Sequence, residues 1–231
     1  MAELIRGLRA ETVAGNLAQV RAEIDAACAR AGRDPAGVEV LAAVKYVATE
    51  ELGVLAQAGV TLVGENRAQS LTEKVQAARE GGLDGFTWDF IGHLQSRKVK
   101  SILPQVRLIH SVASDSVLRE LEKHATDDTE VLVEVNVAGE EHKSGIAPAD
   151  LDAFIARCPA RVSGLMTMPP LAASPEENRP WFALLAALAA ERGLPRLSMG
   201  TTQDYVVAAE EGATIVRIGT RLYGELQGKG P

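Results

Sequence analysis

One lysine, Lys45, ends the apolar run VEVLAAVKYV at residues 38–47. A lysine in such a run either reaches solvent from the end of a strand or is used chemically, because burying an unpaired ammonium costs several kcal/mol. A partly desolvated amine beside other cations loses its proton readily and forms a Schiff base with an aldehyde or ketone. Carbonyl chemistry at Lys45 is therefore the first functional hypothesis.

Two segments near the C-terminus, LSMGTTQDY and VRIGTRLYG, combine glycine with hydroxyl side chains. Backbone N–H groups exposed by glycine, together with the positive end of a following helix, bind phosphate, although the same residues also form ordinary helix caps and turns. The groups concerned are Gly200 with the hydroxyls of Ser198, Thr201 and Thr202, and Gly219 with Thr220. Arg217 stands two residues before Gly219, where alternation could direct its guanidinium at a ring or a carboxylate of the ligand.

The elements that must position these groups alternate along the chain. Strand-like runs occur at residues 38–45, 60–66, 87–94, 106–112, 130–137, 161–168, 196–200 and 214–220, separated by segments of helix-forming composition. Strand followed by helix, repeated eight times without a low-complexity linker, predicts a single (β/α)8 TIM-type barrel domain over residues 1–231. An extra helix is expected at residues 3–31, and a doubly wound open sheet is the structural alternative.

In a barrel, binding and catalytic groups come from the carboxyl ends of the strands. Polar or functional residues stand at these ends: Lys45, Glu65, Asn66, His93, Gln95, His110, Ser111, Asn136, Met166, Ser198, Arg217, Gly219 and Thr220. Because the first strand neighbours the eighth when the barrel closes, Lys45 should face a phosphate-bearing ligand bound at the last two loops. Tyr46 should point to the opposite face of its strand and pack against helices.

Composition limits the classes of function. With 46% hydrophobic and 24% charged residues and a net charge of -7, the chain should not bind nucleic acid or anionic membranes nonspecifically. No stretch resembles a membrane span or a signal peptide, and two cysteines, Cys28 and Cys158, fit a reducing cytoplasm. The histidines lack carboxylates at ligand spacing, so no metal site is expected.

Eight ordered motifs resemble the pyridoxal phosphate homeostasis protein family, which is related to the N-terminal barrel of alanine racemase. They are AVKYV, GENRAQ, FIGHLQSRK, IHSV, VNVAGEEHKSG, GLMTM, LSMG and VRIGTRLYG, between about residues 36 and 224. Two positions depart from the family pattern: Val44 replaces a common Ser or Thr, and Arg97 replaces the usual Asn. The second departure lies at the expected rim of the site.

The resemblance implies specific roles. Lys45 would carry pyridoxal 5'-phosphate (PLP) as a covalent aldimine, and Arg217 would approach the pyridine nitrogen. The other residues implied around the cofactor are Asn66, Met166, Ser198, Thr202, Gly219 and Thr220. Lys143, in the EEHKSG segment, would take part in releasing the cofactor or passing it on to apo forms of PLP-dependent enzymes.

Carrier and enzyme remain alternatives. An arginine at the pyridine nitrogen keeps it unprotonated and weakens carbanion stabilisation, so little catalysis is expected. The chain ends seven residues after LYG, which predicts that the second domain and second base of alanine racemase are absent. The expected function is PLP binding and supply in vitamin B6 homeostasis. The alternatives are a low-activity amino-acid racemase or related enzyme using His110 or Lys143, and a Schiff-base aldolase.

Overall fold

The computed structural model describes residues 4–224. Eight parallel strands form a closed barrel in chain order, with β1 paired to both β2 and β8. They are β1 (Glu39–Ala43), β2 (Leu62–Glu65), β3 (Thr87–Phe90), β4 (Leu108–Val112), β5 (Glu130–Glu134), β6 (Arg161–Met166), β7 (Arg196–Thr201) and β8 (Ile215–Ile218). The pairing of β1 with β8 confirms the predicted (β/α)8 barrel and excludes the doubly wound open sheet.

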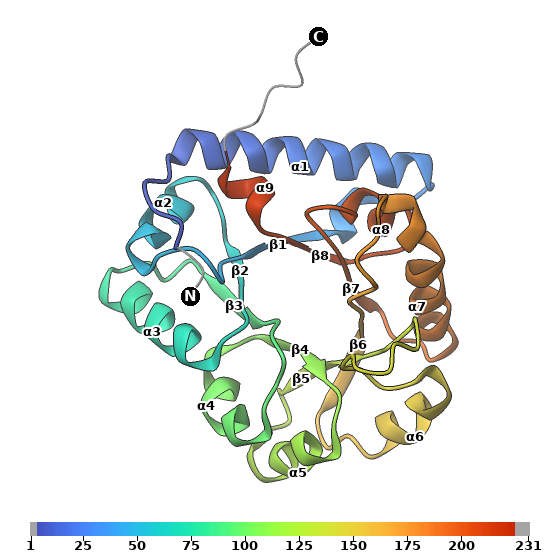
Figure 1. The fold of residues 1–231 in the computed structure, drawn as a ribbon. Helices are drawn as coiled ribbons and strands as arrows, with labels where there is room; N and C mark the ends of the chain where they lie inside the picture. The colour runs from blue at the N-terminus through green and yellow to red at the C-terminus, as the bar shows by residue number, and fades with distance from the viewer. Residues whose placement is uncertain (1–3, 225–231) are drawn as a thin grey trace.

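Helices surround the strands, so that the barrel is covered on its outer face (Figure 1). They are α1 (Ala10–Arg30), α2 (Leu52–Gln57), α3 (Ala68–Glu80), α4 (Val99–Ile102), α5 (Asp115–His124), α6 (Leu151–Ala156), α7 (Arg179–Glu191), α8 (Tyr205–Glu210) and α9 (Thr220–Tyr223). Apolar side chains from both faces of the strands are buried, as expected for a parallel sheet with helices outside and a filled interior. The interior layer contains Leu41, Leu62, Leu108, Leu132, Met166 and Ile215.

The extra N-terminal helix is confirmed, but its predicted start is wrong. Helix α1 begins at Ala10, whereas the described residues before it are not helical, and Ile5 forms a parallel bridge with Val47. The backbone N–H groups of Gly7 and Leu8 donate to the Glu51 carboxylate at 2.7 and 3.0 Å, in place of bonds within a helix. Glu3, also in the predicted helix, lies outside the described residues.

Helix α1 packs against α8 and α9, beside the strands that close the barrel (Figure 1). Its buried face includes Val13, Val20 and Ile24, which repeat at helical spacing. Between residues 4 and 224, none of the helices combines the length and apolarity needed to cross a bilayer.

Candidate functional site

A cavity of about 330 Å³ opens at the carboxyl ends of β1, β2, β7 and β8. Its walls are formed by Ile5, Ala43, Lys45, Tyr46, Asn66, Ile91, Met168, Thr201, Thr202, Gln203, Arg217, Gly219, Thr220 and Tyr223. Barrel closure therefore brings together the amine from the first strand–helix unit and the hydroxyl-rich loops from the last two. These groups are more than 150 residues apart in sequence.

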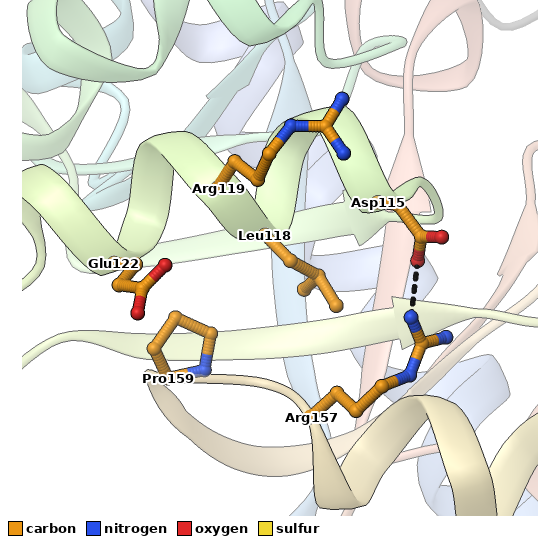
Figure 2. A pocket seen from close by; sticks show the side chains of 6 residues that line it. All are labelled: Asp115, Leu118, Arg119, Glu122, Arg157 and Pro159. Atoms are coloured by element: carbon orange, nitrogen blue, oxygen red, sulfur yellow. Dashed lines mark hydrogen bonds and ion pairs between the residues drawn. The ribbon is translucent and has the colours of Figure 1, made fainter.

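A second hollow, of about 250 Å³, lies on the outer surface between α5 and the end of α6 (Figure 2). An exposed ion pair between Arg157 and Asp115, 2.8 Å apart, crosses one side of it. The remaining walls come from Leu118, Arg119, Glu122 and Pro159. None of the predicted site residues lines this hollow, so the barrel mouth is the candidate site.

Lys45 lies just beyond β1, in a turn closed by the bond from Val47 N to Val44 O at 3.0 Å. The Lys45 Nζ stands 4.7 Å from the centre of the Tyr46 ring, and both side chains line the cavity. The predicted outward orientation of Tyr46 is wrong, because side-chain alternation applies only within an extended strand and β1 ends at Ala43. The turn presents the two consecutive side chains to one space.

A buried ion pair holds this turn against β2. Lys74 Nζ, on α3, lies 2.6 Å from Glu65 Oε2 and donates to the Val44 carbonyl at 2.5 Å. The other carboxylate oxygen of Glu65 accepts from the backbone N–H of Asn66 at 2.7 Å. One charge pair thus fixes the backbone immediately before Lys45 and the backbone of Asn66. Lys74 was not among the predicted site residues; it is a buried lysine in the helix that follows the GENRAQ motif.

Asn66 lines the cavity with its Oδ1 buried and without a hydrogen-bond partner among the described residues. Its backbone packs directly on Gly92, where an added Cβ would collide with Asn66 backbone atoms. A buried amide oxygen without a partner costs free energy unless a ligand or water supplies a donor. Asn66 is therefore suited to a polar ligand in this cavity.

Arg217 is buried, with 6% of its surface exposed, and reaches the cavity wall from β8. Its Nη1 donates to Ser198 Oγ at 2.5 Å and its Nη2 donates to the Thr167 carbonyl at 2.9 Å. Burial lowers the pKa of Arg217 to about 10, against the opposing attraction of Asp204 and Glu134. The guanidinium remains charged near neutral pH and is a permanent donor at the cavity.

Two predicted residues lie beneath the cavity instead of in its wall. Ser198 is fully buried and bonds to Arg217 and to His110, and Met166 belongs to the interior apolar layer of the barrel. Met168 occupies the wall, where its Sδ lies 2.8 Å from Arg217 Nη2. Met168 was missed because it follows the end of β6, where two-residue alternation no longer indicates direction.

The hydroxyl- and glycine-rich loops meet at the other side of the cavity. The Gly219 N–H donates to Thr202 Oγ1 at 3.1 Å, and α9 begins at Thr220. The N–H groups in the first turn of a helix have no acceptor within that helix. Gly200, the next-to-last residue of β7, has a φ of +87°, a conformation that favours glycine. Both loops therefore line the cavity with hydroxyl side chains, those of Thr201, Thr202 and Thr220.

Lys143 is held at the rim and does not line the cavity. Its Nζ pairs with Glu140 Oε2 at 2.5 Å and donates to the Pro169 carbonyl at 3.3 Å, which links the β5 and β6 loops. The departures from the family pattern also lie away from the cavity wall. Val44 is buried, and the exposed Arg97 donates to Gln95 at 3.2 Å.

His110 was predicted to stand with the polar groups at the strand ends, and the structure corrects this. Its ring is fully buried inside the barrel, because β4 continues two residues beyond it to Val112. Within residues 4–224, no group of three or more His, Cys, Asp or Glu side chains is arranged to hold a metal ion.

Comparison with known proteins extends the resemblance to the whole barrel. Residues 15–227 match the family described as "Alanine racemase, N-terminal domain". A pyridoxal phosphate homeostasis protein of Aquifex aeolicus is 41% identical over 222 residues, covering 90% of this chain and 96% of the relative. The corresponding protein of Escherichia coli K12 is 33% identical, with 92% and 96% covered.

A solved structure of PipY from Synechococcus elongatus, described as having PLP bound, superposes with a TM-score of 0.76 at 27% identity. The match covers 92% of this chain and 100% of PipY. The barrel described above is therefore shared over essentially the full length of that protein.

Proposed function

The chain belongs to the alanine racemase N-terminal domain family and, within it, to the pyridoxal phosphate homeostasis proteins, and on this premise we propose that it binds PLP at the barrel mouth. We further propose that it holds PLP reversibly and supplies it to other proteins. The observation that carries the proposal is the convergence of Lys45, Arg217 and the two loops after β7 and β8 on one cavity.

The residues present fit this ligand. The phosphate would be held by the loops containing Thr202, Gly219 and Thr220, which supply hydroxyl and backbone donors at an end of the barrel where phosphate commonly binds. Asn66 would supply the polar partner for the ring substituents, and its buried Oδ1 has no competing donor within residues 4–224. Arg217 would donate to the pyridine nitrogen, and Ser198 and Met166 would support the site from below.

Lys45 would retain PLP covalently. When bound, PLP would supply a reactive aldehyde, and the Lys45 amine would be the group that holds it through a reversible C=N linkage. Water hydrolyses such a linkage, so it would protect the aldehyde without making binding permanent. The exposed rim at Lys143, beside the β6 loop, is the proposed route by which PLP leaves.

The site favours a carrier over an enzyme. Because the Arg217 guanidinium keeps its protons at neutral pH, it would act as a donor to the ring nitrogen, which would then stay unprotonated and withdraw electrons weakly. A racemase also needs acid/base groups on both faces of the substrate α-carbon. Burial raises the pKa of Tyr223 well above its usual range, and the Tyr223 hydroxyl donates to Ala43 O at 3.2 Å, so it is a poor base.

The two earlier candidates for a second base are also unsuitable. His110 is enclosed in the barrel interior, and Lys143 is paired with Glu140 at the rim. We propose that amino-acid turnover is slow. Incubation of the PLP-loaded protein with L-alanine, L-serine and L-glutamate in D₂O, followed by NMR and chiral chromatography, tests this. Turnover above about 1 s⁻¹, near the low end of enzyme rates, would establish a racemase or related enzyme.

The binding mode is tested with Lys45→Ala. This variant should lose the visible absorbance of the lysine–PLP Schiff base but retain weak binding in equilibrium dialysis, because the phosphate loops and Arg217 contribute separately. Lys100→Ala, which removes an exposed lysine on α4, is the matched control and should bind as the parent does. Retention of the visible band in Lys45→Ala would exclude Lys45, and complete loss of binding would exclude an independent phosphate site.

Supply is tested by mixing the PLP-loaded protein with an apo PLP-dependent enzyme and following the recovery of its activity. A rate that rises with acceptor concentration indicates direct transfer, and a rate fixed by dissociation indicates transfer through solution. Failure to reactivate the acceptor under conditions where free PLP does so would contradict the carrier function.

A further inference from the structure

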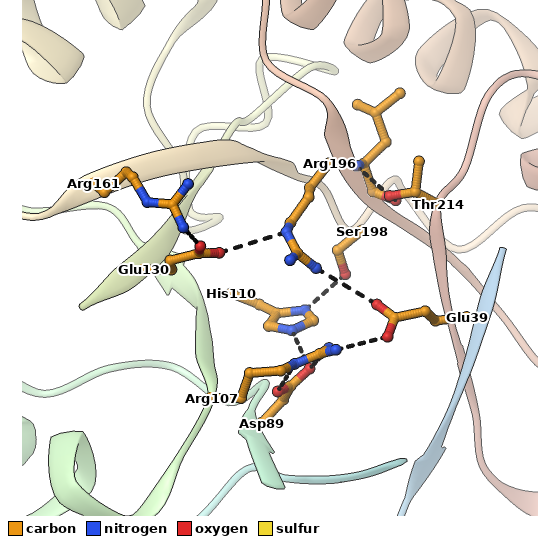
Figure 3. Close-up of polar contacts among 10 residues, drawn as sticks. Glu39, Asp89, Arg107, His110, Glu130, Arg161, Arg196, Ser198 and Thr214 are labelled. Atoms are coloured by element: carbon orange, nitrogen blue, oxygen red, sulfur yellow. Dashed lines mark hydrogen bonds and ion pairs between the residues drawn. The ribbon is translucent and has the colours of Figure 1, made fainter. Parts of the chain in front are cut away.

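A chain of buried polar side chains runs through the barrel interior below the cavity (Figure 3). Asp89 on β3, His110 on β4 and Ser198 on β7 are fully buried, and they connect Arg217 to Arg107 at the amino end of the barrel. Apolar side chains, among them Leu41, Leu108 and Leu132, occupy much of the same interior layer. Buried polar groups are retained at such a position only when they are hydrogen-bonded, and here each is.

The ionisation state of Asp89 determines which atoms donate along this chain of hydrogen bonds. Burial alone would raise the pKa of this carboxyl, but hydrogen bonds from His110 and Arg107 lower it below its ordinary value. Arg107 donates to both carboxylate oxygens, at 3.1 and 2.7 Å. An ionised carboxylate only accepts. The 3.1 Å contact between Asp89 Oδ2 and His110 Nε2 therefore places a proton on Nε2.

His110 determines the next two bonds. Complete burial lowers the pKa of its ring, so the imidazole is neutral near pH 7 and Nδ1 carries no proton. The Ser198 hydroxyl, 2.8 Å from Nδ1, must then donate to it. The Ser198 oxygen keeps lone pairs toward Arg217, whose Nη1 donates to it at 2.5 Å.

We propose that Asp89, His110 and Ser198 form a positioning relay that fixes the orientation of Arg217 toward the ligand. Ser198 accepts one N–H of Nη1, and the Thr167 carbonyl and Met168 Sδ accept from Nη2. Of the five guanidinium N–H groups, the second on Nη1 and the one on Nε have no acceptor among the described residues, so the relay leaves these two donors for the ligand ring. The proposal deepens the proposed PLP site and rests on it, but its hydrogen-bond directions are properties of the protein alone.

The first test uses PLP-free protein and nitrogen-detected NMR of the histidine rings at neutral pH. The His110 signal should show the neutral tautomer with the proton on Nε2. In Asp89→Asn, the carboxamide can donate to Nε2, so the proton should move to Nδ1, which then donates to Ser198. A cationic ring, or a proton on Nδ1 in the parent protein, would overturn the relay without any variant having to fold.

The second test measures PLP affinity. Removing one hydrogen bond to Arg217 in Ser198→Ala should raise the Kd for PLP roughly 3- to 10-fold. Ser163→Ala is the matched control, because Ser163 is also a buried serine on a barrel strand but its hydroxyl has no hydrogen-bond partner in the described part of the chain. Ser198→Thr retains the hydroxyl and should recover most of the lost affinity. Asp89→Asn should weaken binding by a similar factor.

These outcomes separate the relay from the proposed function. If the parent protein binds no PLP, the proposed function fails, and the NMR tautomer still reports on the relay. If the parent binds PLP and the Ser198→Ala and Ser163→Ala variants have equal affinity, the relay has no positioning role and the polar chain only fills the barrel.

Discussion

At the scale of single residues, the site depends on side chains whose backbone is held from behind. Lys74 bonds the carbonyl before Lys45, and Glu65 bonds the N–H of Asn66, so two cavity residues share one buried support. Breaking a buried ion pair leaves an uncompensated charge and is strongly destabilising. The backbone positions of Lys45 and Asn66 therefore depend on Lys74 and Glu65, two charged residues that do not line the cavity.

Substitution of Gly92 tests whether the position of the Asn66 backbone matters for binding. An added Cβ would collide with the Asn66 backbone, so Gly92→Ala should displace Asn66, raise the Kd for PLP roughly tenfold, and lower stability by about 1–3 kcal/mol. Affinity titration and thermal unfolding measure the two effects. In Gly53→Ala, the new methyl group meets open space on α2, and both properties should be kept or slightly improved. Unchanged affinity in Gly92→Ala would show that Asn66 does not bind the ligand.

At the scale of elements, the segment before α1 is part of the site. Ile5 lines the cavity, and its N–H bonds to the Tyr46 carbonyl at 2.7 Å, beside Lys45. Glu51, at the start of α2, accepts both N–H groups of Gly7 and Leu8. The N-terminal segment is thus bonded both to Glu51, next to the first residue of α2, and to Tyr46 in the turn that carries Lys45.

Loss of the Glu51 carboxylate should loosen this segment. In Glu51→Ala two backbone donors lose their acceptor, which should cost about 1–3 kcal/mol and speed PLP dissociation several-fold. Glu50→Ala is the control, because Glu50 also contacts the segment through Arg6, but that ion pair is 61% and 55% exposed and worth little. Stopped-flow measurement of PLP release compares them. Equal release rates would show that the segment does not cover the site.

At the scale of the whole molecule, charged and polar side chains are linked from the amino ends of the strands to the cavity at their carboxyl ends. At the amino ends of the strands, Arg107 joins Glu39 at 2.6 Å and Asp89 at 2.7 Å, and Arg196 lies near Glu39 and Glu130 (Figure 3). His110 connects this cluster to the cavity side through Ser198. The barrel interior therefore couples the stability of the fold to the protonation of two buried groups.

The pH dependence of stability follows from the direction of these shifts. The pKa values of Asp89 and His110 are lower in the folded protein than in the unfolded chain, so both groups stabilise the fold above their unfolded values and lose this contribution in acid. The free energy of unfolding of PLP-free protein should begin to fall below about pH 6.5, where unfolded histidine titrates, and fall further near pH 4.

Two histidine variants isolate the upper part of this dependence. His110→Gln should flatten the change in stability between about pH 6.5 and 5, whatever its effect on stability at neutral pH. His124→Gln, at the partly exposed end of α5, should retain the slope of the parent. Denaturant unfolding at a series of pH values checks this, and a parental slope in His110→Gln would place the titrating group elsewhere.

The sequence by itself determined the strand–helix alternation, the strand positions and the candidate groups Lys45, Arg217 and Asn66. These features follow from hydrophobic periodicity and from residue types within short sequence windows, so they can be recognised without the tertiary structure. The tertiary structure decided which candidates share the cavity. In the structure Tyr46 points into the cavity, and His110 is buried inside the barrel. Met168 lines the cavity wall and Met166 does not. Ile5 also lines the cavity, and Lys74 supports the turn that carries Lys45. These outcomes depend on where each strand ends and on contacts made only when β1 meets β8, so no local pattern encodes them.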